Sequence, residues 1–480
     1  MKTYKFIFTT FVSLFALSAC DDMLDINQDP ARISPEQVTL QTLLPAAERY
    51  TATCFFGAAQ YGGLYPQYTA GQQIDQYTPY GMDQLWRPFY LNALPTLQEL
   101  IERADSQGAR NYAGIGRTLL ALNLMMVADT WGDAPYTDAN QGSDLLYPCY
   151  DEMQFLYEDV LSDMLDQAIE DLQAPLPELP SLSTVRGDYF YGGDLSQWLK
   201  AAYGARARYH LHLAEQNPAL LSNAVEDARR SFDSPAGEED LQMIYDEQVQ
   251  NPWFSFIGNP VNKIMQPSSY IMNLMNGTGY YEELPDPRIS AYADNGSADG
   301  SGDYIGTTPG TLVGENPEVN VNITTNTFFA DNTSPLLILT TAEMKFILAE
   351  ALFASDRNAA YEAYLEGIEV SMRKVGVSED ELSNYLSDPQ ISMGATNLAL
   401  RDIMVQKYIA LYLQIETWTD LRRYQYDNNV YPDLTGPVTN QIDPVSRPWV
   451  QRANIADDEP GRNTCIPEVE NQAQVLWLFQ

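Results

Sequence analysis

Hydrophobic side chains recur at helical spacing along much of the chain, and the pattern is longest over residues 398–424. There, Leu, Met, Tyr, Ile and Trp side chains fall on one stripe that no Gly or Pro interrupts. The pattern predicts one long helix whose stripe packs on other helices, because a helix of this length is not stable by propensity alone. Residues 341–354 and 361–372 carry two shorter helical patterns just before it.

Upstream of this block, the same periodicity predicts further helices. Pro45 marks a candidate kink or boundary, because proline lacks the N–H that a helix interior needs. The chain does not show the alternation of apolar and polar residues that is typical of half-buried strands, so we expect a mainly α fold. The predicted helical segments are residues 37–50, 86–101, 112–129, 151–172, 194–216 and 219–231.

Three regions lack this periodicity. Residues 61–80 alternate tyrosines with glutamines, and their Gly and Pro residues exclude a regular helix. Residues 234–340 are rich in Gly, Asn, Pro and Tyr, which predicts a loop-rich inserted subdomain of the kind that often carries function. The expected organisation is a first helical half at residues 37–233, a ligand-binding loop region at 234–340, a second helical half at 341–424 and an irregular tail at 425–480.

The first residues have the form of a lipoprotein signal peptide. Two lysines precede an apolar run that ends in Leu-Ser-Ala directly before Cys20. Cleavage would remove residues 1–19 and leave Cys20 to be acylated, with residues 20–36 as a polar tether. Because several acyl chains give stable anchoring, we expect a lipid-anchored protein. The alternative is an ordinary signal peptide with a chance cysteine.

Composition narrows the range of partners. The 480-residue chain has 27 basic and 65 acidic residues, a formal net charge of −38. It offers no cationic stripe to neutralise phosphates, so nucleic acid is not an expected partner. The acidity instead favours solubility and repulsion from a like-charged cell surface. Beyond Cys20, the cysteines are Cys54, Cys149 and Cys465, among which at most one disulfide can form.

Motifs for catalysis or metal binding are sparse. His210 and His212 are the only histidines, and two positions apart on a helix they point to different sides. The nucleophile elbow, the P-loop and the HExxH motif are absent from the sequence. Asp299, Ser301 and Asp303 offer oxygen ligands at alternate positions but fail the EF-hand pattern, so a solvated turn explains them better. We expect no catalytic residues, no metal and no cofactor.

Aromatic side chains among Gly, Pro, Gln and Asn mark the candidate ligand site. The chain has 31 Tyr and 7 Trp, whose flat apolar faces and polar tips suit both cores and binding surfaces. Off a helix stripe, such rings can stack on a sugar or a peptide side chain while amides supply hydrogen bonds. Each ring could equally pin a loop to the scaffold. The candidate ligand-binding residues are Tyr65, Tyr68, Gln72, Gln76, Tyr77, Trp86, Trp253, Asn276, Tyr280 and Tyr281.

Six stretches along the chain carry a family resemblance. They are residues 128–136 (ADTWGDAPY), 188–194 (DYFYGGD), 339–351 (LTTAEMKFILAEA), 367–372 (GIEVSM), 406–410 (QKYIA) and 416–423 (ETWTDLRR). In this order they resemble the SusD/RagB family, and more narrowly its nutrient-binding lipoprotein branch, over nearly the whole mature chain. The resemblance implies a tetratricopeptide-like helical scaffold, although no strict 34-residue repeat is visible.

The resemblance also implies a function. It places the protein at the bacterial outer membrane, lipid-anchored and facing the exterior, where it captures glycans or peptides and delivers them to a TonB-dependent (SusC-like) transporter. Two other classes stay open. A surface glycan hydrolase would need two carboxylates facing one cleft, about 5–10 Å apart. An adhesive surface protein would show a broad apolar patch without a pocket.

Overall fold

In a computed structural model of the chain, residues 38–257, 265–297 and 302–480 are described. Helices predominate in these residues and the strands are short, which confirms the mainly helical fold class. Within the same three ranges, no helix has both the length and the apolar character needed to cross a membrane. Cys20, the expected signal peptide and the expected tether lie outside the described residues.

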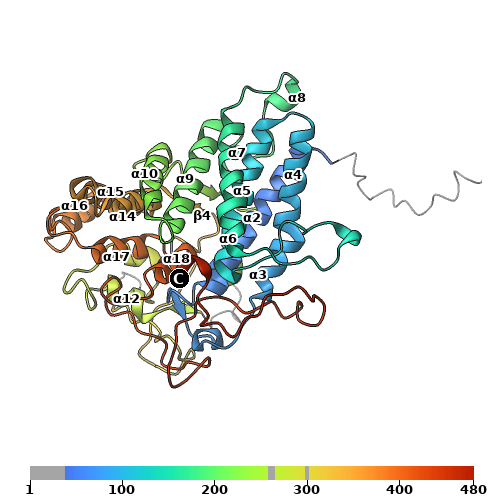
Figure 1. The fold of residues 1–480 in the computed structure, drawn as a ribbon. Coiled ribbons are helices and arrows are strands. Elements are labelled where there is room, and N and C mark those ends of the chain that lie inside the picture. The colour runs from blue at the N-terminus through green and yellow to red at the C-terminus, as the bar shows by residue number, and fades with distance from the viewer. Residues whose placement is uncertain (1–37, 258–264, 298–301) are drawn as a thin grey trace, which may run out of the picture.

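A series of packed helices forms the scaffold. They are α2 (Leu40–Gly62), α4 (Leu94–Ser106), α5 (Arg110–Trp131), α7 (Ser162–Gln173), α9 (Leu195–Leu213), α10 (Leu221–Arg230), α14 (Thr341–Leu352), α15 (Arg357–Lys374), α16 (Glu379–Ser387), α17 (Leu400–Ala410) and α18 (Glu416–Arg423). Consecutive helices pack on one another from α2 through α4, α5, α7, α9, α10 and α14 to α15. In Figure 1 they run as a curved row from blue through green to orange.

Shorter elements and loops lie along one side of this row (Figure 1). Two small antiparallel sheets tie distant segments together: β1 (Thr69–Ala70) pairs with β3 (Gln266–Pro267), and β2 (Leu241–Met243) pairs with β4 (Leu336–Leu339). The remaining helices are α3 (Asp83–Pro88), α6 (Met153–Phe155), α8 (Pro180–Ser183), α11 (Pro252–Ile257), α12 (Ser269–Met275) and α13 (Ile289–Tyr292). A π-helical turn at Phe89–Ala93 joins α3 to α4.

Local sequence sets where several helices begin. The Asp194 carboxylate accepts hydrogen bonds from the backbone N–H groups of Ser196 and Gln197 and caps α9. The Thr340 hydroxyl caps α14 in the same way, by accepting from the N–H of Glu343. Helix α5 is buried almost throughout, which explains why its sequence is rich in Leu and Met on every face.

The predicted single helix over residues 398–424 is wrong. α17 ends at Ala410 and α18 begins at Glu416, with Leu413 between them in the left-handed backbone region at φ 57°. The intervening Tyr412 ring stacks on Tyr292, with the ring centroids 4.7 Å apart. An uninterrupted hydrophobic stripe therefore does not require one helix, because tertiary packing of a buried aromatic residue can turn the chain within it.

Pro45 does not end the first helix. α2 continues through it to Gly62, twelve residues beyond the predicted end at residue 50. Leu44, Ala47 and Thr51 are fully buried around this point, so packing of α2 against the core outweighs the loss of one intrahelical hydrogen bond.

A cluster of charged residues lies inside the scaffold, and we call it the buried ion network. The ammonium group of Lys407 lies 3.1 Å from a Glu350 carboxylate oxygen and 2.8 Å from one of Asp420. Arg423 pairs with the same two carboxylates. Burial alone would raise the pKa of Glu350, but the charges of Arg423 and Lys407 lower it to about 2. The other members are Asp129, Arg208, His212, Glu343, Glu416 and Arg422.

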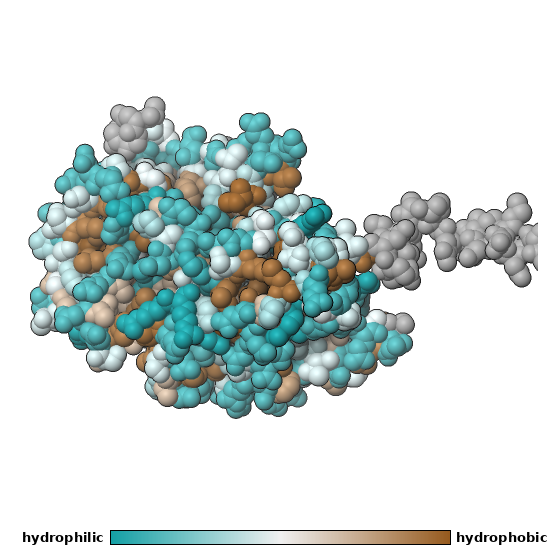
Figure 2. All heavy atoms as spheres, turned by 90° about the horizontal axis from the view of Figure 1, so that it is seen from above, coloured by the Kyte–Doolittle hydropathy of each residue, from teal (hydrophilic) through white to brown (hydrophobic). Residues whose placement is uncertain are grey.

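The surface seen in Figure 2 is mixed. Hydrophobic residues form patches on this face, and hydrophilic residues border each of them. Such a surface fits the strongly acidic composition.

Candidate ligand-binding site

Six of the ten candidate residues lie in the core. Each has at most 6% of its surface exposed, so in this conformation a ligand cannot stack on its ring. These residues are Tyr65, Tyr68, Tyr77, Trp86, Trp253 and Tyr281.

Tyr65 and Tyr68 pin the 61–80 loop to the second helical half, and the Tyr77 ring packs on Tyr65. The Tyr68 hydroxyl donates to the carbonyl of Tyr408 at 2.6 Å and lies 2.6 Å from the hydroxyl of Thr417. The Tyr65 ring lies 4.8 Å from the ring of Trp418. The expectation that Tyr65, Tyr68 and Tyr77 contact a ligand is therefore corrected. Their rings stabilise the fold, which was the alternative stated for each ring.

The other candidates contact different elements and do not form one site. Trp253 packs edge-on against Phe56 of α2, with the ring centroids 5.0 Å apart. The Tyr280 hydroxyl donates to the carboxylate of Asp402 in α17 at 2.7 Å, and Tyr281 is buried beside it. For Trp253 and Tyr281 the expected contact with a ligand is therefore corrected as well.

Three half-buried amides complete the set. The side-chain N–H of Asn276 donates to the Tyr304 carbonyl at 2.9 Å, so it holds a loop in place. The side-chain oxygen of Gln76 accepts from Gln441 of the tail at 2.9 Å. Gln72 is half-buried at the start of the 3-10 helical turn Gln73–Gln76. With Tyr280, these amides remain predictions as ligand contacts.

Trp86 lines a concave site that contains none of the other candidate residues, and we call this site the aromatic pocket. It has a volume of about 520 Å³ and three walls. The first is α3 with the π-helical turn that follows it, the second is the loop 135–148, and the third is the tail segment 458–463. Figure 1 shows the corresponding teal and dark red loops beside α3. The volume lies within the ordinary range of small-ligand sites.

Trp86 and Tyr90 line the first wall of this pocket and belong to a larger cluster of packed rings. Trp86 lies 4.3 Å from Tyr90 between ring centroids and stacks at 6.1 Å on Tyr150. Trp131 packs edge-on behind Trp86, so the indole is fixed in orientation. The π-helical turn places Tyr90 and Leu91 at the first wall, as such bulges often do at functional sites.

The outer rim of the aromatic pocket is apolar and exposed. Leu91 is 72% exposed, Leu146 68% and Tyr147 51%. Three large apolar side chains lining one hollow with this exposure offer a surface that a ligand can cover. Leu146 and Tyr147 were not among the predicted site residues, although Tyr147 directly precedes Pro148 and Cys149, off any helical stripe.

Charged and polar groups stand around the rings. The Arg87 guanidinium donates to the carboxylate of Asp458 at 3.1 Å, and this pairing raises the pKa of Arg87. The Tyr90 hydroxyl donates to the Pro135 carbonyl at 3.0 Å, and burial raises its pKa, so it stays protonated at neutral pH. Asn140 also lines the pocket. Rings with a few directional polar groups form the kind of site that binds sugars or aromatic and apolar ligands.

Two further hollows are less aromatic. A cleft of about 540 Å³ is lined mainly by aliphatic, proline and amide side chains, among them Gln441, the partner of Gln76. A cavity of about 340 Å³ contains Ser162, His210 and Asp227. In it, His210 Nδ1 lies 3.0 Å from an Asp227 oxygen, whereas Ser162 makes no hydrogen bond to His210.

Histidines and acidic residues do not form a metal centre in the described ranges. No group of three or more His, Cys, Asp or Glu side chains there is placed to hold an ion. His210 contacts Asp227, while His212 is buried between Asp129 and Glu416, so the two rings diverge as their spacing predicts. Asp299 and Ser301 of the considered calcium loop lie outside the described residues.

The chain was compared with known proteins. A family model described as SusD-like, "Starch-binding associating with outer membrane", matches residues 29–448. Among solved structures, a chitin-binding SusD homolog from Flavobacterium johnsoniae is 19% identical with a TM-score of 0.72, over 91% of this chain and 97% of that one. A SusD/RagB family protein from Bacteroides thetaiotaomicron is 21% identical with a TM-score of 0.69, over 92% and 99%.

A SusD homolog from Bacteroides uniformis is 18% identical with a TM-score of 0.70, over 91% of this chain and 99% of that one. A search of curated proteins found no match. The structural likenesses show a shared fold, and the family model covers most of the chain. The protein therefore belongs to the SusD-like family.

Proposed function

We propose that the protein captures glycans at the aromatic pocket. The observation that carries this proposal is the half-exposed ring of Tyr147 beside the partly buried ring of Tyr90 in one hollow, where the buried Trp86 ring packs against Tyr90. Flat rings stack on the apolar face of a sugar, and the nearby polar groups supply direction. Membership in a family described as starch-binding supports a glycan over a peptide.

The ligand class is tested by a binding screen with soluble oligosaccharides of starch and chitin and with a peptide library. We expect the protein to bind a glycan, and we expect substitution of Tyr147 to weaken that binding. Binding of peptides without binding of any glycan would overturn the glycan assignment and leave the scaffold assignment intact.

We further propose that Cys20 carries the lipid anchor and that the protein delivers its ligand to a TonB-dependent (SusC-like) transporter at the cell exterior. The Leu-Ser-Ala-Cys20 sequence and the outer-membrane description of the family support this. A tether raises the local concentration of a binding protein beside a membrane partner. Labelling with a fatty-acid analogue should mark the wild type but not Cys20→Ala, and the wild type should co-purify from native membranes with a large barrel protein.

Binding without hydrolysis is part of the proposal. In the aromatic pocket, Asp458 is paired with Arg87, and Glu459 accepts a hydrogen bond from Asn463. In the cavity around His210, the serine and the histidine are not hydrogen-bonded, so no nucleophile is activated there. Incubation with a bound oligosaccharide should return it uncut. Release of shorter products by protein free of contaminating enzymes would favour the hydrolase alternative.

A further inference from the structure

The aromatic pocket has walls from three distant parts of the chain, and each pair of walls is connected. The first wall is joined to the second by the hydrogen bond from the Tyr90 hydroxyl to the Pro135 carbonyl, at 3.0 Å. The first wall is joined to the third by the ion pair of Arg87 with Asp458. The backbone N–H of Asp457 adds a hydrogen bond to Asp83 of α3, at 2.8 Å.

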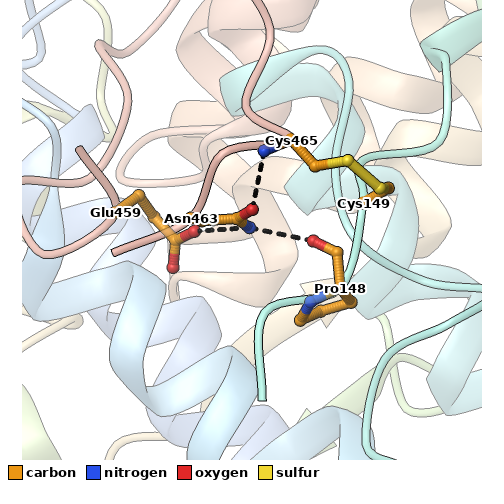
Figure 3. The surroundings of a disulfide bond; sticks show 5 residues. All are labelled: Pro148, Cys149, Glu459, Asn463 and Cys465. Carbon is orange, nitrogen blue, oxygen red and sulfur yellow. Dashed lines mark hydrogen bonds between the residues drawn. A yellow bond between two sulfur atoms is a disulfide. The ribbon is translucent and has the colours of Figure 1, made fainter. Parts of the chain in front are cut away.

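A covalent bond connects the second wall to the third (Figure 3). Cys149 directly follows the loop 135–148, Cys465 follows the tail segment 458–463, and the two form a disulfide. Beside it, the Asn463 side chain donates to the Pro148 carbonyl at 2.8 Å and accepts from the N–H of Cys465 at 2.9 Å. The three connections together form a closed ring of contacts around the pocket.

The contacts that hold the second wall lie at its base, at Asn140 and beside the disulfide. The base of the loop is fixed by backbone hydrogen bonds between Ala134 and Asp151. Farther out, the Asn140 side chain donates to Gln98 at 2.5 Å. The exposed rim residues Leu146 and Tyr147 make no hydrogen bond with another segment among the described residues, and the disulfide and Asn463 follow directly after them.

We propose that the Cys149–Cys465 disulfide is a positioning element of the aromatic pocket: it closes the ring of contacts and holds Tyr147 against the tail so that the pocket is preformed for its ligand. A wall fixed before binding loses less conformational entropy when the ligand arrives. Both cysteines are exposed, so the bond is accessible to a reductant, whereas Cys54 is buried and unpaired. The part of this proposal that concerns affinity rests on the proposed glycan function.

The first measurement needs no ligand. Dithiothreitol reduces the disulfide to two thiols and is itself oxidised to its cyclic disulfide. In the reduced, folded protein, peptides covering residues 138–148 and 456–463 should exchange amide hydrogens about tenfold faster, because local opening becomes easier. Peptides from α5 should be unchanged. A Cys149→Ser/Cys465→Ser variant should behave like the reduced wild type and should not respond to dithiothreitol.

The second measurement is affinity for maltohexaose or N-acetylchitohexaose, whichever the oxidised protein binds. The dissociation constant should be roughly 3–10-fold higher in the reduced and the serine forms, with unchanged circular dichroism. Exchange that does not accelerate on reduction would overturn the proposal, and so would faster exchange with undiminished affinity. If the oxidised protein binds neither sugar, the proposed function fails, and the exchange result still decides whether the disulfide holds the walls. If the serine variant does not fold, the reduced wild type provides both readouts.

Discussion

The buried ion network and the aromatic pocket use related side chains in opposite ways. In the network, Lys407 and Arg423 are surrounded by carboxylates and have at most 2% of their side chains exposed. In the pocket, the pair Arg87–Asp458 has 58% and 42% of its side chains exposed, and Tyr147 faces solvent. A buried ion pair fixes the geometry of a fold, whereas an exposed one contributes little to stability and stays free to meet a ligand.

The two regions also differ in how they relate to the family. Eight members of the network lie in the stretches that resemble SusD/RagB proteins: Asp129, Glu343, Glu350, Lys407, Glu416, Asp420, Arg422 and Arg423. The third wall of the pocket, at residues 458–463, lies beyond the matched residues 29–448. The motifs that carry the family resemblance therefore describe how the scaffold is held together, and one wall of the pocket lies outside the matched residues.

The largest expected effect is loss of a network cation. Lys407→Met should lower the free energy of unfolding by about 3–5 kcal/mol, because Glu350 and Asp420 lose a buried partner. Urea denaturation followed by circular dichroism measures it. Arg87→Met, at the exposed pair, is the matched control and should leave the denaturation midpoint nearly unchanged. Equal midpoint shifts in the two variants would show that the buried and the exposed ion pairs contribute equally to stability.

The second-largest effect should be a loss of stability at acidic pH, caused by protonation of the buried ion network. The pKa of Glu350 is lowered from 4.5 to about 2, so its stabilisation is complete above pH 4.5 and is lost as the pH falls toward 2. Burial raises the pKa of Asp420 to about 6, against the charges of Lys407 and Arg423, so Asp420 favours the folded state as the pH falls from 6 toward 3.8. Thermal denaturation should therefore show the loss beginning below about pH 4.5.

The matched variant for this titration is Glu350→Gln, which cannot ionise. Its melting temperature should fall less steeply below pH 4.5 than that of the wild type, because one depressed carboxyl pKa has been removed. Identical slopes would show that Glu350 does not contribute to the acid response.

A smaller effect should separate the buried tyrosines from the pocket. Tyr68→Phe removes the hydroxyl that contacts the Tyr408 carbonyl and Thr417, and should lower the free energy of unfolding by about 1–3 kcal/mol. Glycan affinity should be unchanged, because the ring of Tyr68 is fully buried. Calorimetric titration of the folded variant checks this. Weaker glycan binding at unchanged stability would show that Tyr68 contributes to the ligand site.

The smallest effect should fall on binding alone. Tyr147→Ala should weaken glycan binding by about 1–2 kcal/mol while the melting temperature stays nearly constant, because the ring lies half exposed at the pocket rim. Tyr189→Ala is the matched control, since Tyr189 is 58% exposed and does not line the pocket. If both variants bind like the wild type, the ligand site lies elsewhere; if both weaken, the loss is not specific to the pocket.

Hydrophobic periodicity was a reliable guide to helices and a poor guide to their ends. It located helical sequence within residues 398–424 but not the turn at Leu413 that divides it into α17 and α18. At this turn the Tyr412 ring packs in the protein core on Tyr292 and Phe329, which lie far upstream in the sequence. Contacts of that kind leave no trace in a local pattern.

The sequence by itself determined the family, the mainly helical fold and the limit of one disulfide among three cysteines, because these depend on local periodicity, motif order and counting. Only the tertiary structure decided which aromatic residues meet solvent. Tyr68 and Tyr147 both lie off a helix stripe, yet one is buried and the other half exposed. Exposure depends on segments brought together from distant parts of the chain, here α17 over Tyr68 and the disulfide-linked tail beside Tyr147, and no local sequence signal encodes that encounter.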